Sequence, residues 1–170
     1  SELRAKLPSL KKTVLLPYWR EQMEAPDDGV VLWDDVVANK AELVYENVPF
    51  NHPLWILYSS GTTGLPKPIV QGHGGILLEH LKALSISDNL TPESTFFWFT
   101  TTGWMMWNYL VGGLLTGATV VLYDGSPTYP DGNVLWELAE KAGITHFGTS
   151  AAFINVCMKH GLKPKEHYDL

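Results

Sequence analysis

Short β-rich runs and stretches of helical spacing alternate along most of the chain. The runs predict strands at Thr13–Tyr18, Leu54–Tyr58, Ile69–Gln71, Phe96–Phe99, Thr119–Tyr123 and His146–Phe147. The apolar spacing predicts helices at Gly75–Leu84, Met105–Leu115, Val134–Lys141 and Ala151–His160. Because helices of about 10–15 residues separate the later strands, the pattern predicts an α/β fold with a helix-covered, mostly parallel sheet.

Two of the predicted helices have glycine stop signals. Gly117 follows the helix at Met105–Leu115, and Gly143 follows the helix at Val134–Lys141. The longest strongly apolar stretch, Trp104–Leu115, falls short of the roughly 20 residues that cross a bilayer. We therefore expect a buried helix there and no membrane partner.

Composition narrows the class of protein. A length of 170 residues predicts one compact unit, and 12 Lys+Arg against 18 Asp+Glu argue against nucleic-acid binding and against an anionic lipid surface. The lone cysteine, Cys157, lies in an apolar stretch, which excludes an internal disulfide and predicts a buried thiol in a reducing compartment. Since the chain begins at Ser1 without a basic, hydrophobic leader, we expect an internal piece of a cytoplasmic protein.

A loop rich in hydroxyl groups and glycine follows the strand predicted at Leu54–Tyr58. Glycines let backbone N–H groups approach an anion, hydroxyls add donors, and a lysine supplies compensating charge. Pro66 and Pro68 favour extended backbone after the loop, so we expect a phosphate-binding loop on a hairpin. The predicted phosphate-binding residues are Ser59, Ser60, Gly61, Thr62, Thr63, Gly64 and Lys67.

Three other types of loop compete with this interpretation. A Walker loop needs Gly-Lys-Ser/Thr, whereas Leu65-Pro66-Lys67 follows Gly64 here. A dinucleotide-binding module needs Gly-x-Gly-x-x-Gly between strand and helix, which the sequence lacks. Composition alone favours a plain surface turn, since Ser, Thr and Gly populate such turns for local reasons.

The order of residues favours phosphate binding over a plain turn. Ser-Ser-Gly-Thr-Thr-Gly-Leu-Pro-Lys at 59–67 resembles the signature of the adenylate-forming superfamily of acyl-CoA synthetases, luciferases and peptide-synthetase adenylation domains. The aromatic block at 96–109 resembles the segment that lines the acyl pocket in that superfamily. The run 101–108, with 117–127, is most similar to the acetoacetyl-CoA synthetases. The resemblance assigns Met105, Met106 and Trp107 to the substrate pocket.

The resemblance implies a two-step ligase reaction in the parent enzyme. A carboxylate attacks the α-phosphorus of ATP to form acyl-AMP and pyrophosphate, and the CoA thiol then displaces AMP. The loop would hold the β- and γ-phosphates, with Lys67 as the catalytic cation and Mg²⁺ sharing the charge. The implied small-molecule substrates are acetoacetate, ATP and CoA.

Substrate choice and metal binding are less clearly marked. Met106 and Trp107 are larger than the matching residues of acetyl-CoA synthetases, and selectivity for a 3-oxo group needs a polar contact, for which Asn108 is a candidate. We expect no catalytic role for His73 and no protein metal site, because four scattered histidines lack the spacing of metal ligands and no second cysteine is present. These are His52, His80, His146 and His160.

The sequence also departs from the superfamily pattern. Pro68 stands where many relatives have glycine, and we expect it to be tolerated at a sheet edge. The Tyr-Gly-x-Thr-Glu segment, the ribose-binding Asp and the C-terminal lysine are absent, so residues 1–170 are expected to be a partial AMP-binding domain, inactive alone. Two alternatives stay open: another short- or medium-chain acyl-CoA synthetase, or a noncatalytic nucleotide-binding module.

Overall fold

The computed structural model describes residues 2–18, 23–59 and 64–170. They form two compact units, Ser1–Asn47 and Val48–Leu170. The expectation of one compact unit was therefore wrong.

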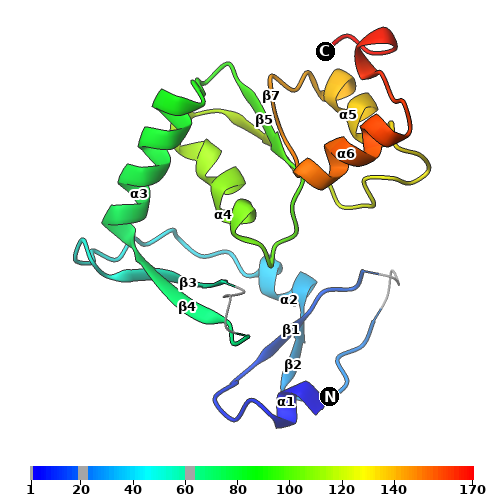
Figure 1. Cartoon of the computed structure of the whole chain (residues 1–170). Coiled ribbons are helices and arrows are strands. Elements are labelled where there is room, and N and C mark those ends of the chain that lie inside the picture. Colours follow the sequence, from blue (N-terminus) through cyan, green and yellow to red (C-terminus); the bar gives the residue numbers. More distant parts are fainter. Residues whose placement is uncertain (1, 19–22, 60–63) are drawn as a thin grey trace. The chain divides into compact units, whose positions relative to one another are not determined.

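The first unit is a small parallel pair of strands with two short helices (Figure 1). Its elements are α1 (Glu2–Ala5), β1 (Thr13–Leu15), β2 (Val30–Leu32) and α2 (Trp33–Ala38). Thr13 pairs with Val30 at the start of the two strands. The strand predicted at Thr13–Tyr18 is confirmed but ends at Leu15, whereas β2 and α2 were not predicted.

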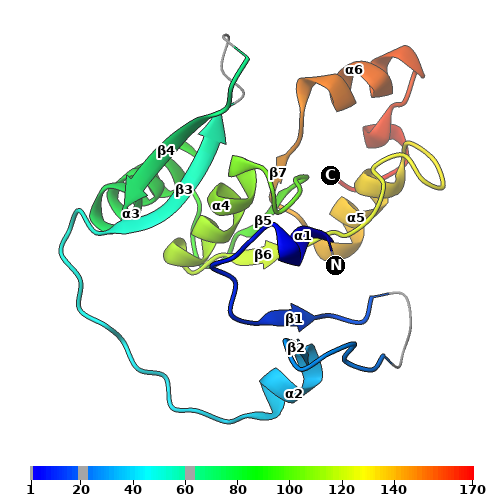
Figure 2. The ribbon, with the colours of Figure 1, turned by 90° about the horizontal axis from the view of Figure 1, so that it is seen from below.

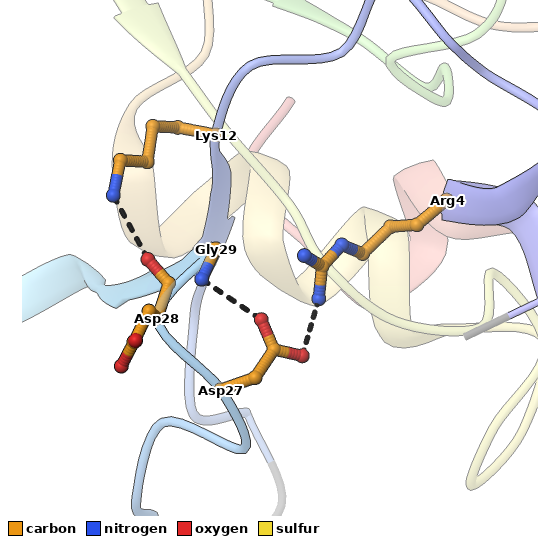
Figure 3. Close-up of polar contacts among 5 residues, drawn as sticks. All are labelled: Arg4, Lys12, Asp27, Asp28 and Gly29. Carbon is orange, nitrogen blue, oxygen red and sulfur yellow. Dashed lines mark hydrogen bonds and ion pairs between the residues drawn. The ribbon is translucent and has the colours of Figure 1, made fainter.

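A polar clasp joins α1 to the turn before β2 (Figure 3). Arg4 Nη1 donates to Asp27 Oδ2 at 2.6 Å, and the second oxygen of Asp27 accepts from the backbone N–H of Gly29 at 2.8 Å. Lys12 Nζ donates to the carbonyl of Asp28 at 2.9 Å. The hydrogen bond from Arg4 lowers the pKa of Asp27. A Cβ at Gly29 would lie 2.1 Å from Arg4 Nη2, so a side chain there would displace the guanidinium at the flexible end of Arg4.

The second unit begins with an antiparallel hairpin, formed by β3 (Pro53–Ser59) and β4 (Lys67–Gly72). Figure 2 shows these strands side by side. The helix α3 (His73–Leu81) follows β4 directly and continues as a π-helical segment, Lys82–Ser87. Pro68 pairs with Tyr58, and β3 is the only partner of β4 in the part of the chain that the structure describes. Pro68 thus lies in a strand with a free edge, as expected.

Three parallel strands form the centre of the second unit, in the order β6-β5-β7. The alternation predicted for strands and helices is confirmed, and Gly117 and Gly143 end their helices with φ of +81° and +59°. The elements are β5 (Thr95–Trp98), α4 (Met105–Gly112), a 3-10 turn (Gly113–Thr116), β6 (Thr119–Val121), α5 (Val134–Ala142), β7 (His146–Gly148), α6 (Ala151–Lys159) and a last 3-10 turn (Pro164–Glu166).

Neighbouring residues of β5 enter two different cores, because successive side chains of a strand point to opposite faces. Phe96 packs with Leu84, Leu110 and Ala118, and Phe97 packs with Leu135, Phe153 and Cys157 on the other face. The sheet is therefore helix-covered on both faces, and the predicted burial of Cys157 is confirmed.

The predicted helix at Met105–Leu115 is less buried and less regular than expected. It ends as an α-helix at Gly112, and Val111 and Leu115 are exposed. The expectation of a wholly buried helix was wrong, because only one side of α4 packs on the sheet. Within the described ranges, no helix has the length and apolarity needed to cross a membrane.

Candidate functional site

The predicted phosphate loop lies at the end of the β3–β4 hairpin. Ser59 ends β3 and Lys67 begins β4, and the two are paired in the strand register. Gly64 has a φ of +93°, with no other heavy atom within 4 Å of the position of a Cβ. Glycine therefore meets a conformational need at 64, and Lys67 is exposed to solvent. The other predicted loop residues lie outside the described residues: Ser60, Gly61, Thr62 and Thr63.

The base of the hairpin is tied to the start of α3. The backbone N–H of His73 donates to the carbonyl of His52 at 3.0 Å, and His73 Nδ1 lies 2.9 Å from the same oxygen. The N–H of Gly74 donates to the carbonyl of Phe50, and a Cβ at Gly74 would lie 2.1 Å from the Phe50 ring. These contacts give His73 and Gly74 a role in holding the hairpin.

The hairpin is attached to the helices a second time through the side chain of His80, which is only 6% exposed. Its ring lies 6.0 Å from the Trp55 ring of β3 and 5.6 Å from the Tyr109 ring of α4, centroid to centroid. Burial lowers the pKa of His80. A Cβ at Gly112 would lie 2.5 Å from His80 Nδ1, so glycine makes room for the imidazole against α4.

A cavity of about 500 Å³ lies beyond the carboxyl ends of β5 and β6, and we call it the strand-end pocket. Open α/β sheets bind ligands at this edge, and the volume is within the range of small-molecule sites. The side chains around it are aromatic, aliphatic and hydroxyl-bearing, with one carboxylate, that of Asp124. The lining residues are Trp98, Phe99, Thr100, Thr101, Thr102, Trp107, Leu110, Leu122, Tyr123, Asp124 and Gly125.

The structure separates the residues predicted for the acyl pocket. Trp107 lines the strand-end pocket, whereas Met105 and Met106, on the first turn of α4, do not. Asn108 lines a second cavity, of about 170 Å³, between β3, α3 and α4. Neighbouring helix residues point about 100° apart, so Trp107 and Asn108 face different cavities.

Several lining residues were not predicted as site residues. Thr100, Thr101 and Thr102 follow β5, and Asp124 and Gly125 lie just after β6. A signal for them existed in the sequence, because residues that follow neighbouring parallel strands meet at one sheet edge. The Tyr123 hydroxyl shapes this edge by donating to the carbonyl of Ser126 at 2.9 Å.

The described donors suit an anion better than a bare metal ion. No group of three or more His, Cys, Asp or Glu side chains that could hold a metal occurs in ranges 2–18, 23–59 and 64–170. Lys67 and the Ser59 hydroxyl offer a cation and a hydrogen-bond donor at the loop. Mg²⁺ at this site would fit as an ion carried on the phosphates of a nucleotide, as in sites with few protein ligands.

Comparisons with known proteins agree with the fold. Acetoacetyl-CoA synthetase from Danio rerio is 45% identical over 96% of this chain, and acetoacetyl-coenzyme A synthetase from Rhizobium meliloti (strain 1021) is 48% identical over 100% of it. The solved structure of acetoacetyl-CoA synthetase from Streptomyces lividans is 56% identical, with a TM-score of 0.90 over 99% of this chain. The chain spans about a quarter of these proteins, 26%, 27% and 26% of their lengths.

The family match covers both units. The family described as AMP-binding enzyme matches residues 2–170, which include the hairpin with its loop and the strand-end pocket. The α/β class and the resemblance found in the sequence are thereby confirmed. The chain belongs to the AMP-binding enzyme family.

Proposed function

We propose that the full-length protein containing these residues is an acid–thiol ligase that converts acetoacetate, ATP and CoA to acetoacetyl-CoA, AMP and pyrophosphate. One observation carries the proposal. A hydroxyl- and glycine-rich loop ending at Lys67 lies on a hairpin, in a chain similar over nearly its whole length to acetoacetyl-CoA synthetases.

The first step forms a mixed anhydride. A carboxylate oxygen of acetoacetate bonds to the α-phosphorus of ATP, the bond from that phosphorus to the β-bridging oxygen breaks, and pyrophosphate leaves. Lys67 stabilises the charge that builds on the leaving group, and the loop hydroxyls and N–H groups orient it. Mg²⁺ bound with the nucleotide would offset part of the same charge.

The second step transfers the acyl group. The CoA sulfur, as thiolate, attacks the acyl carbon, and the carbon–oxygen bond to AMP breaks. No protein nucleophile is needed in either step, so the contribution of the chain is positioning and electrostatic stabilisation.

The strand-end pocket supplies the groups to recognise the acid. Trp107 and Trp98 provide apolar walls, and Thr101 and Thr102 offer hydroxyl donors for the 3-oxo group. These hydroxyls take the role expected for Asn108, which lines the other cavity. Met105 and Met106 stay predicted pocket residues at the entrance of α4.

A longer acid is the second candidate substrate. The strand-end pocket has about 500 Å³, more room than a four-carbon acid needs.

We also propose a cytoplasmic location, since the only thiol, Cys157, is buried and unpaired as in a reducing compartment.

The test is a substrate panel with the full-length protein. Acetoacetate, acetate and butyrate are each supplied with ATP, Mg²⁺ and CoA, and AMP, pyrophosphate and acyl-CoA are quantified. The proposal expects the highest kcat/KM for acetoacetate. A higher kcat/KM for butyrate would keep the ligase and replace the substrate, and no AMP with any acid would favour a noncatalytic nucleotide-binding module.

A further inference from the structure

A line of four aromatic rings connects the loop-bearing hairpin with the strand-end pocket. Trp55 of β3 contacts His80 of α3, His80 contacts Tyr109 of α4, and Tyr109 contacts Trp98 of β5. The centroid separations are 6.0, 5.6 and 6.0 Å, within the usual range for aromatic pairs. We call these residues the aromatic chain. Its last member, Trp98, lines the strand-end pocket.

Three rings of the aromatic chain, those of Trp55, His80 and Tyr109, are held by further contacts. Trp55 Nε1 donates to Gln71 Oε1 across the hairpin. The Tyr109 hydroxyl donates to Asp88 Oδ2 at 2.7 Å, and His80 lies against Gly112. Side chains fixed at both ends have few alternative rotamers, so a displacement at one end is passed to the next ring.

The hairpin depends on such contacts for its direction. In the described residues it is a sheet of two strands, and two-stranded hairpins are marginal without packing support. Ser59 follows Trp55 by four residues along β3, a reach of about 13 Å. A small rotation at Trp55 therefore moves Ser59, where the loop begins, by a distance that matters for in-line attack, where about 1 Å of misplacement can cost 10²-fold in rate.

We infer that His80 is a positioning residue, which sets the hairpin ends at Ser59 and Lys67 relative to the strand-end pocket so that nucleotide and acid are held in one reactive geometry. It touches neither substrate and acts through Trp55 and Tyr109. The inference rests on the proposed function. By linkage, a contact that favours one shared geometry makes each substrate strengthen the binding of the other by the same factor.

Two substitutions distinguish the packing of the His80 ring from the role of its nitrogen atoms. His80→Ala removes both ring contacts, whereas His80→Phe keeps an aromatic ring without the imidazole nitrogens. The additional atom of phenylalanine has space in the adjoining cavity of about 170 Å³. Trp136→Leu is the matched control: Trp136 stacks on Phe147 at 4.9 Å in the core on the other face of the sheet, outside the aromatic chain.

The experiment measures acetoacetate-dependent exchange of pyrophosphate into ATP by the full-length enzyme, without CoA. The KM for acetoacetate is determined at low and at saturating ATP. The coupling factor is the KM at low ATP divided by the KM at saturating ATP. Unfolding midpoints of all variants are recorded alongside. We expect a coupling factor above 1 in the wild type. His80→Ala should lower kcat about 10²-fold and bring the factor to 1, His80→Phe should restore most of both, and Trp136→Leu should lower only the unfolding midpoint.

The possible failures differ. No exchange by the wild type would overturn the proposed function and this inference with it. Exchange by the wild type with a coupling factor of 1, or His80→Ala with unchanged kcat and coupling, would overturn the inference alone.

Discussion

The β3–β4 hairpin carries its loop on two strands, whereas the β6-β5-β7 sheet carries its pocket on three strands packed on both faces. In the hairpin, Ile56 and Tyr58 are 54% and 67% exposed, but Phe96 and Phe97 of β5 are 3% and 1% exposed. Burial therefore fixes the pocket, and a few specific contacts hold the hairpin. Substitutions in the sheet should act on stability, and substitutions in the hairpin should act on nucleotide binding and chemistry.

The largest effect is expected in the sheet. Phe97→Ala removes the ring that packs on Leu135 and Phe153, and we expect a loss of about 3–5 kcal/mol in the free energy of unfolding. Urea unfolding followed by tryptophan fluorescence measures it. The control Phe97→Leu should cost less than about 1.5 kcal/mol, and equal costs for both variants would contradict a tightly packed site.

Lys67→Ala tests the hairpin instead of the sheet. We expect the rate of adenylate formation to fall about 10²-fold, the usual loss of one charge-stabilising donor, without a shift in the unfolding midpoint. Lys165→Ala, another exposed lysine, is the control and should leave the rate unchanged. A rate loss that follows a fall in unfolding midpoint would mean that Lys67 supports structure instead.

Gly64→Ala tests the conformation of the loop. Its φ of +93° disfavours a side chain, at a cost of roughly 1–2 kcal/mol, so we expect KM for ATP to rise about 5- to 30-fold. Gly75 of α3 also has open space beside it but has no positive φ, so Gly75→Ala should leave KM unchanged. Equal KM values in both variants would show that the glycine at 64 is not required.

The smallest expected effect is on the pH dependence of stability. Burial lowers the pKa of His80 below its ordinary value of 6.5, and the nearby charge of Glu79 partly offsets this. The folded state thus binds the proton less well than the unfolded state, so stability is full above pH 6.5 and falls as the pH drops below it. Urea midpoints at pH 7.5 and 5.5 should differ more for the wild type than for His80→Phe, and the reverse order would contradict a buried neutral imidazole.

The sequence predicted the parallel sheet better than it predicted the surroundings of the loop. β-rich runs and the glycine stops at Gly117 and Gly143 locate the later elements, because burial imposes a regular pattern there. In the first unit, β2 and α2 escaped prediction because β2 passes into α2 without a turn residue between Leu32 and Trp33. Both elements are short, so their periodicity carries little signal.

For a different reason, the sequence could not predict that Trp107 and Asn108 line different cavities. Helical spacing shows that Trp107 and Asn108 lie on different sides of α4, but not which cavity each side faces. That depends on the placement of β3 and α3, which is set by Trp55 and His80 far away in sequence. The chemistry of the loop, in contrast, was carried by local residue order and stays a prediction for all of its residues from Ser59 to Lys67.

The most direct test of the proposed reaction follows an oxygen atom. Acetoacetate labelled with ¹⁸O in its carboxylate is incubated with ATP, Mg²⁺, CoA and the full-length protein, and the nucleotide and phosphate products are analysed by mass spectrometry. Attack of the carboxylate on the α-phosphorus predicts one ¹⁸O atom in AMP and none in pyrophosphate. Label in orthophosphate, or AMP without label, would contradict the account.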